Sequence, residues 1–327
     1  REVNIETKAA MTQGGHLFRY DYLVLGLGAQ AADYGIPGIR EYSCQFKTLD
    51  DAIMIGEKTV QLFQELEQGS RQAPIRISTV GAGFTGIELA AELALYGRKM
   101  CAKCGLSGKP FMVYLFEAGP RILPTISDTE RERIRVRLTK LGVIITENAS
   151  INALENTVLK LKSGQKFSSD MTVWTAGIQA NEFVRSINGL QCTDKGKLIV
   201  GEHLYGPAHR NIFGVGDTIE FIDHATQKPI PSLAYLAADH GRIVAENIVR
   251  SIRGQKLAVH KPFYELWVAP VGGKYAIAHL WWGISIKGFF GWVVRELVDL
   301  RYFMQILPVR KALKFFIRQQ LIFLKKD

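Results

Sequence analysis

The chain has 327 residues, and its 41 Lys or Arg exceed its 31 Asp or Glu, giving a formal net charge of +10. A hydrophobic fraction of 47 % excludes a disordered or low-complexity chain, and the length favours two domains over one. Four cysteines are too few for a secreted disulfide scaffold, so we expect a reducing compartment. Because no apolar stretch reaches the roughly 20 residues of a membrane-spanning helix, none is predicted.

The start of the chain predicts a strand over Arg1–Thr7, where Val3 and Ile5 alternate with polar neighbours. No signal peptide is predicted there. Because the sequence has no initiator Met and begins inside this pattern, we expect a fragment or a processed form.

Strands and helices alternate along the rest of the chain. The predicted strands are 22–25, 75–80, 111–116, 143–146, 171–174 and 212–213, with a hairpin over 158–167. The predicted helices are one that opens at Asp50 and those at 87–96, 128–141 and 232–253, with a basic loop at 98–110. This alternation predicts an α/β fold with parallel sheets.

The motif Gly81-x-Gly83-x-x-Gly86 lies between a predicted strand and a predicted helix. Gly81 permits a tight turn, Gly83 lets the backbone approach a pyrophosphate, and Gly86 allows close packing of helix on strand. The helix N-terminus then offers free N–H groups and a partial positive charge to the phosphates. A tight helix–strand corner without a ligand is the alternative, but the surrounding elements favour a dinucleotide site.

Two acidic residues belong to the same prediction. Glu117 ends the next strand, where a carboxylate accepts hydrogen bonds from ribose hydroxyls and disfavours a 2′-phosphate, so NADH is favoured over NADPH. The basic loop accounts for the long interval between Gly86 and Glu117. Glu88 lies on the first helical turn, where it either favours the helix dipole or acts near the nicotinamide as a catalytic residue.

Five segments in this order resemble the flavoproteins with two dinucleotide-binding domains, and most closely the type II, non-proton-pumping NADH:quinone oxidoreductases. They are Tyr20–Gly28, Thr79–Leu89, Phe116–Pro124, Val173–Gly177 and Phe213–Asp217. The resemblance implies two Rossmann-like domains, with the FAD domain interrupted by the NADH domain, and a C-terminal amphipathic membrane-associated region. The boundaries that we predict are 1–46 and 167–258 for FAD, 47–166 for NADH, and 259–327 for the membrane-interface region.

The same resemblance implies FAD and NADH as cofactors and assigns residues to each. Asp217 would hydrogen-bond the FAD ribitol, and Gly216 would allow its close approach. The helix after Pro231 would direct its positive end at the flavin. The residues at its start are Ser232, Leu233 and Ala234, and those that would line the nicotinamide are Thr175, Ala176 and Gly177.

The sequence departs from the family pattern in two places. The family's first strand, with its own Gly-x-Gly-x-x-Gly and ribose-binding acid, is missing before Tyr20, so the N-terminal part of the FAD domain is predicted to be truncated. The quinone-site helix of the family commonly reads Ala-Gln-x-Ala-x-Gln. Here Tyr235 and Asp239 replace both glutamines around Ala237, which leaves the identity of the acceptor open.

The segment from Lys287 onward has nine Lys or Arg and three acids, so it holds most of the net positive charge. Pro308 can begin a helix on which cations and apolar side chains gather on largely opposite faces. The cations are Arg310, Lys311, Lys314, Arg318 and Lys325, and the apolar residues are Val309, Leu313, Phe316, Ile317 and Leu324. We predict contact with a membrane surface rather than a helix packed on the body, and no nucleic acid as partner.

The four cysteines are interpreted as ordinary residues. Cys101 and Cys104 follow a helix and lack a second ligand pair, so no metal site is predicted. A sulfide:quinone oxidoreductase needs cysteines around the flavin, and none flanks Trp174–Gly177.

These features together predict an NADH:quinone oxidoreductase on the cytoplasmic face of a cell membrane, or on an equivalent organelle inner membrane. The expected partners are NADH and a membrane quinone, and the resemblance allows a homodimer. A related flavoprotein with another donor or acceptor, such as a sulfide:quinone oxidoreductase, and a truncated, non-catalytic NAD-binding membrane protein stay open as alternatives.

Overall fold

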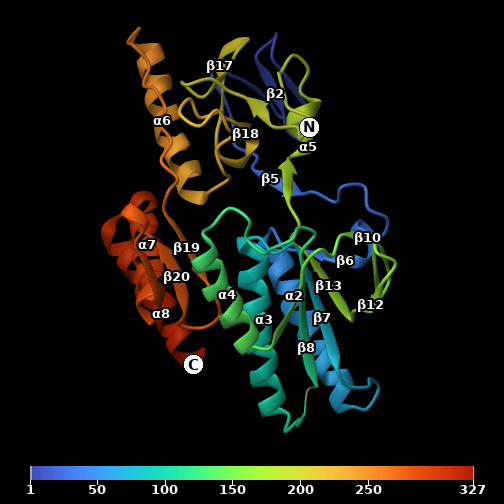
Figure 1. The fold of residues 1–327 in the computed structure, drawn as a ribbon. Helices are drawn as coiled ribbons and strands as arrows, with labels where there is room; N and C mark the ends of the chain where they lie inside the picture. Colours follow the sequence, from blue (N-terminus) through green and yellow to red (C-terminus); the bar gives the residue numbers. More distant parts are fainter. Residues whose placement is uncertain (1, 109, 327) are drawn as a thin grey trace. The chain divides into compact units, whose positions relative to one another are not determined.

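The computed structural model describes residues 2–108 and 110–326, with side chains up to residue 321. The chain forms two compact units, each assembled from separate segments (Figure 1). Unit 1 comprises Arg1–Gln30 and Ile178–Tyr264, and unit 2 comprises Ala31–Gly177 and Glu265–Asp327. The short strands β5 (Ala29–Ala31) and β14 (Ile178–Ala180) lie where the chain passes from one unit to the other.

Unit 2 is built on a five-stranded sheet in which every pairing is parallel. Its order is β6 (Ser43–Gln45), β13 (Met171–Trp174), β7 (Ile75–Val80), β8 (Phe111–Phe116) and β9 (Val143–Thr146). The helices that pack along it are α2 (Leu49–Glu67), α3 (Phe84–Lys103) and α4 (Asp128–Lys140) (Figure 1). The predicted α/β fold is confirmed.

Local sequence explains why these helices begin where they do. Thr48 and Asp51 form a reciprocal capping box at the start of α2, and the Ser127 hydroxyl accepts the Glu130 N–H at the start of α4. Helix α3 can pack closely on β8 because Gly97 has no side chain. A Cβ at this position would lie 2.1 Å from the Phe111 ring. This helix continues to Lys103, so the first part of the predicted basic loop at 98–110 is helical instead.

The C-terminal segment shares the core of unit 2. Strands β19 (Trp267–Pro270), β20 (Ala276–His279) and β21 (Ser285–Gly288) form an antiparallel sheet, followed by α7 (Phe289–Ile306) and α8 (Val309–Lys326). Ala269, Val271 and Ile277 are fully buried in one cluster with residues of α3 and β7. Unit 2 also contains the short helix α1 (Ile39–Tyr42) and the small sheet of β10 (Ile151–Glu155), β11 (Val158–Leu161) and β12 (Lys166–Ser168). The last two strands form the predicted hairpin.

Unit 1 contains three small sheets and a long helix. The sheets are β1 (Glu2–Asn4), β2 (Ala9–Met11), β3 (Leu17–Arg19); β16 (Tyr205–Gly206), β17 (His209–Gly214), β4 (Leu23–Leu25); and β15 (Leu198–Ile199), β18 (Ile219–Glu220). The helices are α5 (Glu182–Ser186) and α6 (Ala234–Ile252). Leu25, Phe213 and Val244 bring β4, β17 and α6 into one buried cluster. The predicted first strand is shorter than expected, and α6 begins two residues after Ser232.

The divisions between the units differ from the boundaries that we predicted at 46, 166 and 258. Strand β13 hydrogen-bonds to β6 on one side and to β7 on the other, which joins residues 31–46 and 167–177 to the sheet of unit 2. The shared core adds the segment after Tyr264 to the same unit. The nucleotide that each unit binds stays a prediction.

Candidate dinucleotide-binding site

Three loops that are distant in sequence leave the sheet of unit 2 side by side. Trp174 of β13 is the register partner of Val80 of β7, and Val80 is the partner of Phe116 of β8. The residues that follow these three strand ends are Thr175, Gly81 and Glu117. Ligands of parallel α/β sheets bind at the carboxyl ends of the strands, so this edge has the position expected of a site.

The three glycines of the motif differ in what surrounds them. A Cβ at Gly86 would lie 1.8 Å from the Gly81 carbonyl oxygen, and one at Gly81 would lie 2.6 Å from the Ala176 Cα. These two positions need glycine for the packing of the protein itself. A Cβ at Gly83 would meet no described heavy atom within 4 Å. Gly83 therefore opens onto the space that a close-approaching pyrophosphate needs, so the loop fits a bound dinucleotide.

The start of α3 lies at the glycine loop and is suited to bind an anion. Gly83 is the N-cap, and no described side chain caps this helix end. The first-turn N–H groups of a helix have no partner within the helix, and they carry part of its positive dipole charge. A phosphate is a good acceptor for such N–H groups.

Glu117 connects the glycine loop to the turn that follows it through its two carboxylate oxygens. Its Oε2 accepts the Ala82 N–H at 2.9 Å, and its Oε1 accepts the Gly119 N–H at 2.8 Å. A carboxylate has about four acceptor positions, so these two bonds leave capacity for ribose hydroxyls. Its ribose-binding role stays a prediction.

The change Glu117→Gln tests this role. Because an amide keeps one acceptor oxygen and loses the negative charge, the NADPH-to-NADH ratio of dissociation constants should fall at least about fivefold. Titration calorimetry with both nucleotides measures this ratio. Glu155→Gln, which neutralises an exposed carboxylate in β10, is the control. An unchanged ratio in Glu117→Gln would contradict the ribose role.

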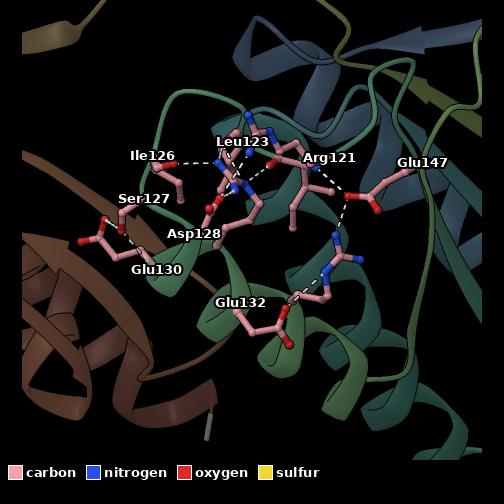
Figure 2. A network of polar contacts seen from close by, with 11 residues as sticks. Arg121, Leu123, Ile126, Ser127, Asp128, Glu130, Glu132 and Glu147 are labelled. Atoms are coloured by element: carbon pink, nitrogen blue, oxygen red, sulfur yellow. Dashed lines mark hydrogen bonds and ion pairs between the residues drawn. The ribbon is translucent and has the colours of Figure 1, made fainter.

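The loop that follows Glu117 is held by α4. The buried Arg131 donates to the carbonyl oxygens of Ile122 at 2.9 Å and Ile126 at 2.7 Å and also pairs with Asp128 (Figure 2). Glu147 accepts the Ile122 N–H at 2.8 Å (Figure 2). The Glu-Ala-Gly-Pro-Arg-Ile-Leu-Pro run therefore forms a fixed turn beside the glycine loop.

The predicted nicotinamide residues lie at the third strand end. The Thr175 hydroxyl donates to the Val80 carbonyl at 2.8 Å and lies 3.0 Å from that of Gly81, so it ties two loops together. Gly177 has a φ of 107°, and a Cβ there would lie 2.0 Å from the Tyr34 hydroxyl. Contact with a nicotinamide stays a prediction for all three residues of Thr175–Gly177.

Glu88 has an unusual protonation equilibrium on α3. Burial raises its pKa from 4.5 to about 7, against the attraction of the Arg295 guanidinium and with a smaller contribution from Glu92. A carboxyl that titrates near neutral pH beside a predicted nicotinamide site is suited to acid–base work. Both interpretations of Glu88 made from the sequence stay open.

Glu88→Gln should change how stability depends on pH. The folded state holds the Glu88 proton between pH 4.5 and about 7 while the unfolded state releases it, so wild-type stability falls as pH rises through this range. Above it, Glu88→Gln should be more stable than wild type by up to about 3 kcal/mol, and similar to it near pH 4. Urea unfolding across the range measures the difference. Glu57→Gln, at an exposed position of α2, should show no such trend, and equal trends in both variants would contradict the prediction.

A second site forms in unit 1 where β17 meets the start of α6. Gly216 and Asp217 lie in a short 3₁₀ turn (Gly216–Thr218), and the pocket beside it includes the start of the predicted flavin helix. The lining residues are Gly216, Ile219, Ile230, Pro231, Ser232, Leu233, Leu236, Ala237 and His240. No described side chain caps the start of α6, where the helix dipole is positive. Gly216, Ser232 and Leu233, three of the residues predicted to contact FAD, therefore lie at one pocket, and their contact with the flavin stays a prediction.

Lys197 is a neighbour of this pocket that no sequence pattern indicates. Its Nζ lies 3.3 Å from the Ser232 Oγ, and burial lowers its pKa against the attraction of the Asp217 and Glu220 carboxylates. Its place depends on the pairing of β15 with β18, which no local pattern predicts.

The predicted quinone residues divide between two faces of α6. Ala237 lines the pocket, and its Cβ lies 3.2 Å from where a Cβ of Gly216 would be. Tyr235 and Asp239 are not among the described residues that line it. Burial raises the pKa of Tyr235 to about 12, while Asp239 forms an ion pair with Arg242 at 2.9 Å. Their role in quinone binding stays a prediction.

The fold and the glycine-rich strand ends define a dinucleotide-binding α/β protein. Residues 2–241 match the family model of the pyridine nucleotide-disulphide oxidoreductases, and the chain belongs to this family.

Named relatives narrow the comparison. The type II NADH:quinone oxidoreductase of Staphylococcus haemolyticus is 26 % identical over 317 residues, covering 95 % of this chain and 78 % of the relative. The demethylphylloquinone reductase NdbB of Synechocystis sp. is 28 % identical over 296 residues, covering 89 % of this chain and 68 % of the relative. The structure of NDH2 from Plasmodium falciparum in complex with NADH has the same fold, with a TM-score of 0.84, 15 % identity, and coverage of 97 % of this chain and 81 % of that one.

Proposed function

We propose that this protein is an FAD-dependent oxidoreductase that takes a hydride from NADH and passes two electrons to a membrane quinone without pumping protons. The observation that carries this proposal is the convergence of the Gly81–Gly86 loop, Glu117 and Thr175 at three adjacent strand ends, with open space at Gly83. Membership of the pyridine nucleotide-disulphide oxidoreductases and the names of the relatives support it.

The residues of the chain bind and orient the reactants in this proposal. The N–H groups at the start of α3 bind the pyrophosphate of NADH, and Glu117 binds its ribose. Thr175–Gly177 and Glu88 lie against the nicotinamide. Asp217 and the start of α6 hold the flavin, which supplies the hydride and electron chemistry when bound.

The acceptor site is proposed on α6, around Tyr235, Ala237 and Asp239. A tyrosine hydroxyl and a carboxylate can both hydrogen-bond a quinone or quinol oxygen, as the amides of the family pattern would. The Synechocystis relative is named as a reductase of a demethylated phylloquinone, so a naphthoquinone is the first acceptor to assay.

Contact with a membrane surface is supported by the side chains of α8. Val309, Leu313, Ile317 and Leu321, spaced four apart, are each more than 40 % exposed. The face of α8 that packs on α7 has the buried Ala312 and the half-buried Phe316, and Gln319 donates to Asp299 at 2.9 Å. Leu324 and Lys325 lie outside the residues whose side chains are described.

A stripe of cations follows the apolar stripe one residue further along the helix. Arg310, Lys314 and Arg318 are all exposed, so they lie beside the apolar side chains rather than on the face opposite to them. This pairing suits a helix that lies in the interface of an anionic membrane. None of the described helices is long and apolar enough to cross a bilayer.

The cellular placement follows from this chemistry. NADH is a cytoplasmic substrate, so we propose attachment at the cytoplasmic face of the cell membrane or the corresponding face of an organelle inner membrane. Sedimentation of the detergent-solubilised protein measures whether it forms a homodimer.

The proposed function is tested by anaerobic mixing of the full-length holoprotein with NADH in a stopped-flow spectrometer. We expect the flavin absorbance to bleach within the dead time or in a rapid phase, and to return when a soluble naphthoquinone is added. Absence of bound flavin, or flavin that NADH leaves oxidised, would contradict the proposal. Bleaching without return on quinone would instead indicate another acceptor.

A further inference from the structure

Two buried histidines of unit 1 lie in direct contact at the predicted flavin pocket, and one of them, His240, lines it. His240 of α6 and His260, in the segment after α6, are each 2 % exposed, and their Nε2 atoms are 3.1 Å apart. Their rings meet edge to face with centroids 4.6 Å apart. The mechanism proposed above uses neither of them.

The contacts of this pair fix where each proton lies. A backbone N–H can only donate, and the Gly216 N–H lies 3.1 Å from the His240 Nδ1, so this nitrogen carries no proton. The proton of neutral His240 is then on Nε2, from which it is donated to His260. His260 accepts at Nε2 and must carry its own proton on Nδ1.

The series of contacts that begins at the Gly216 N–H and runs through His240 and His260 ends at a carboxylate, that of Asp239. We refer to this series as the histidine chain. The His260 Nδ1 lies 3.5 Å from the Asp239 Oδ2 and makes no hydrogen bond to any described residue. The Asp239 side chain is 35 % exposed and pairs with Arg242. A negative charge at this end favours a proton on the facing nitrogen, so Asp239 reinforces the proton positions that the Gly216 N–H sets.

The pair is built to stay neutral. A proton added to the His240 Nδ1 would face the Gly216 N–H, and one added to the His260 Nε2 would face the N–H of His240. Burial lowers the pKa of both rings, that of His240 to about 4. Around His240 the Asp217 and Asp239 carboxylates oppose this shift, and around His260 Asp239 opposes it while Arg242 adds to it.

The segment that carries His260 is held in place although it has no regular secondary structure. Asn247 of α6, fully buried, accepts the Ala258 N–H at 2.7 Å and donates to the Ala258 carbonyl at 3.0 Å. The His260 N–H donates to the Glu202 carbonyl at 2.7 Å. The Phe221 ring packs edge-on against the His260 ring. These contacts hold the His260 ring in place beside His240.

We propose that His240 and His260 are positioning residues: they form a neutral chain of fixed tautomers that links Asp239 to the Gly216 N–H and holds the turn carrying Asp217. This inference rests on the proposed function for its purpose, since that turn is where the flavin is expected to bind. The histidine chain does not conduct protons, because its inner end is a backbone amide that does not ionise. It holds Gly216, whose φ of 62° is a left-handed conformation, against α6.

Two amide substitutions separate the contacts of His240. In His240→Asn the Oδ1 replaces the Nδ1 and can accept the Gly216 N–H, whereas the side chain of His240→Gln reaches toward His260 and leaves this N–H without an acceptor. We expect deuterium exchange at the Gly216 amide to be at least about tenfold faster in His240→Gln than in His240→Asn. FAD release should follow the same order. His209→Asn, which alters a single histidine–carbonyl contact elsewhere in unit 1, should leave both rates unchanged.

A spectroscopic measurement tests the tautomers directly. In the full-length holoprotein labelled with ¹⁵N-histidine, His240 should show a proton on Nε2 and His260 a proton on Nδ1 at neutral pH. A His260 proton on Nε2, or equal Gly216 exchange in the two His240 variants, would overturn the proposal. Both readouts come from the protein itself, so they decide the proposal even if the proposed reaction with NADH fails.

Discussion

Replacing Gly83 by Ala should weaken NADH binding at least about tenfold while the protein stays folded. The added Cβ meets no described atom within 4 Å, and the φ of −73° at this residue suits alanine. The methyl group instead occupies the space where the pyrophosphate would approach the start of α3. Alanine is a poorer N-cap than glycine, so a loss of about 1 kcal/mol in unfolding free energy is the most that we expect. Calorimetric titration with NADH and urea unfolding measure the two effects.

Two further glycine changes make this result specific. Gly86→Ala should lower the unfolding free energy by roughly 1–3 kcal/mol or more, because its Cβ would lie 1.8 Å from the Gly81 carbonyl oxygen. Gly56→Ala, at an exposed position inside α2 with open space around it, should raise stability by about 0.5–1 kcal/mol and leave NADH affinity unchanged. If Gly83→Ala bound NADH as tightly as Gly56→Ala does, the site would not be where we place it.

Neutralising the cationic stripe of α8 should weaken membrane binding by about two orders of magnitude. Each basic residue near an anionic surface contributes about 1 kcal/mol, so the triple change Arg310→Gln, Lys314→Gln and Arg318→Gln removes about 3 kcal/mol. Glutamine keeps a good helix propensity, so α8 should be retained. Co-sedimentation with vesicles of phosphatidylglycerol and phosphatidylcholine measures the partition coefficient.

The comparison variant carries the same charge change at exposed positions elsewhere in unit 2, with Lys99, Lys162 and Lys166 each changed to Gln. It should bind these vesicles nearly as well as wild type. On vesicles of phosphatidylcholine alone, or at high salt, the difference between the α8 variant and wild type should vanish. Equal losses in both triple variants would show that net charge, and not the α8 stripe, attaches the protein.

The buried parallel strands were the most predictable part of the fold. Strands β7, β8, β9 and β13 begin and end at the predicted residues, because each is a short run rich in β-branched and aromatic residues. The grouping of these strands could not be predicted in the same way. The place of β13 between β6 and β7 depends on pairings between residues far apart in sequence, which leave no local pattern.

The starts of helices that a side chain caps could be predicted from the sequence. The end of α3 could not, because a run of charged residues was interpreted as a loop. The charged residues of 98–103 were interpreted as a loop, yet Arg, Lys, Met and Ala are good helix formers, and the first glycine after them is Gly105. Helix α3 accordingly runs on to Lys103.

The residues of the candidate sites also differ in whether a local sequence pattern indicates them. The glycine motif and Glu117 could be found from spacing alone, since each role is tied to a strand end. Lys197 and His260 could not, because their neighbours come from other segments of unit 1 and each residue alone looks ordinary. His240 had one available signal, its place directly after Asp239 on the predicted helix.

The order of segments in unit 1 has a consequence for synthesis on the ribosome. Strand β4 pairs in parallel with β17, yet all of Ala31–Gly177 is translated between the two parts of this unit. At roughly 5–20 residues per second, β4 must stay unpaired with β17 for about 10–40 s after it emerges. During that interval the first apolar strand is open to chaperones, so cellular yield should depend on them more than the stability of the finished protein would suggest.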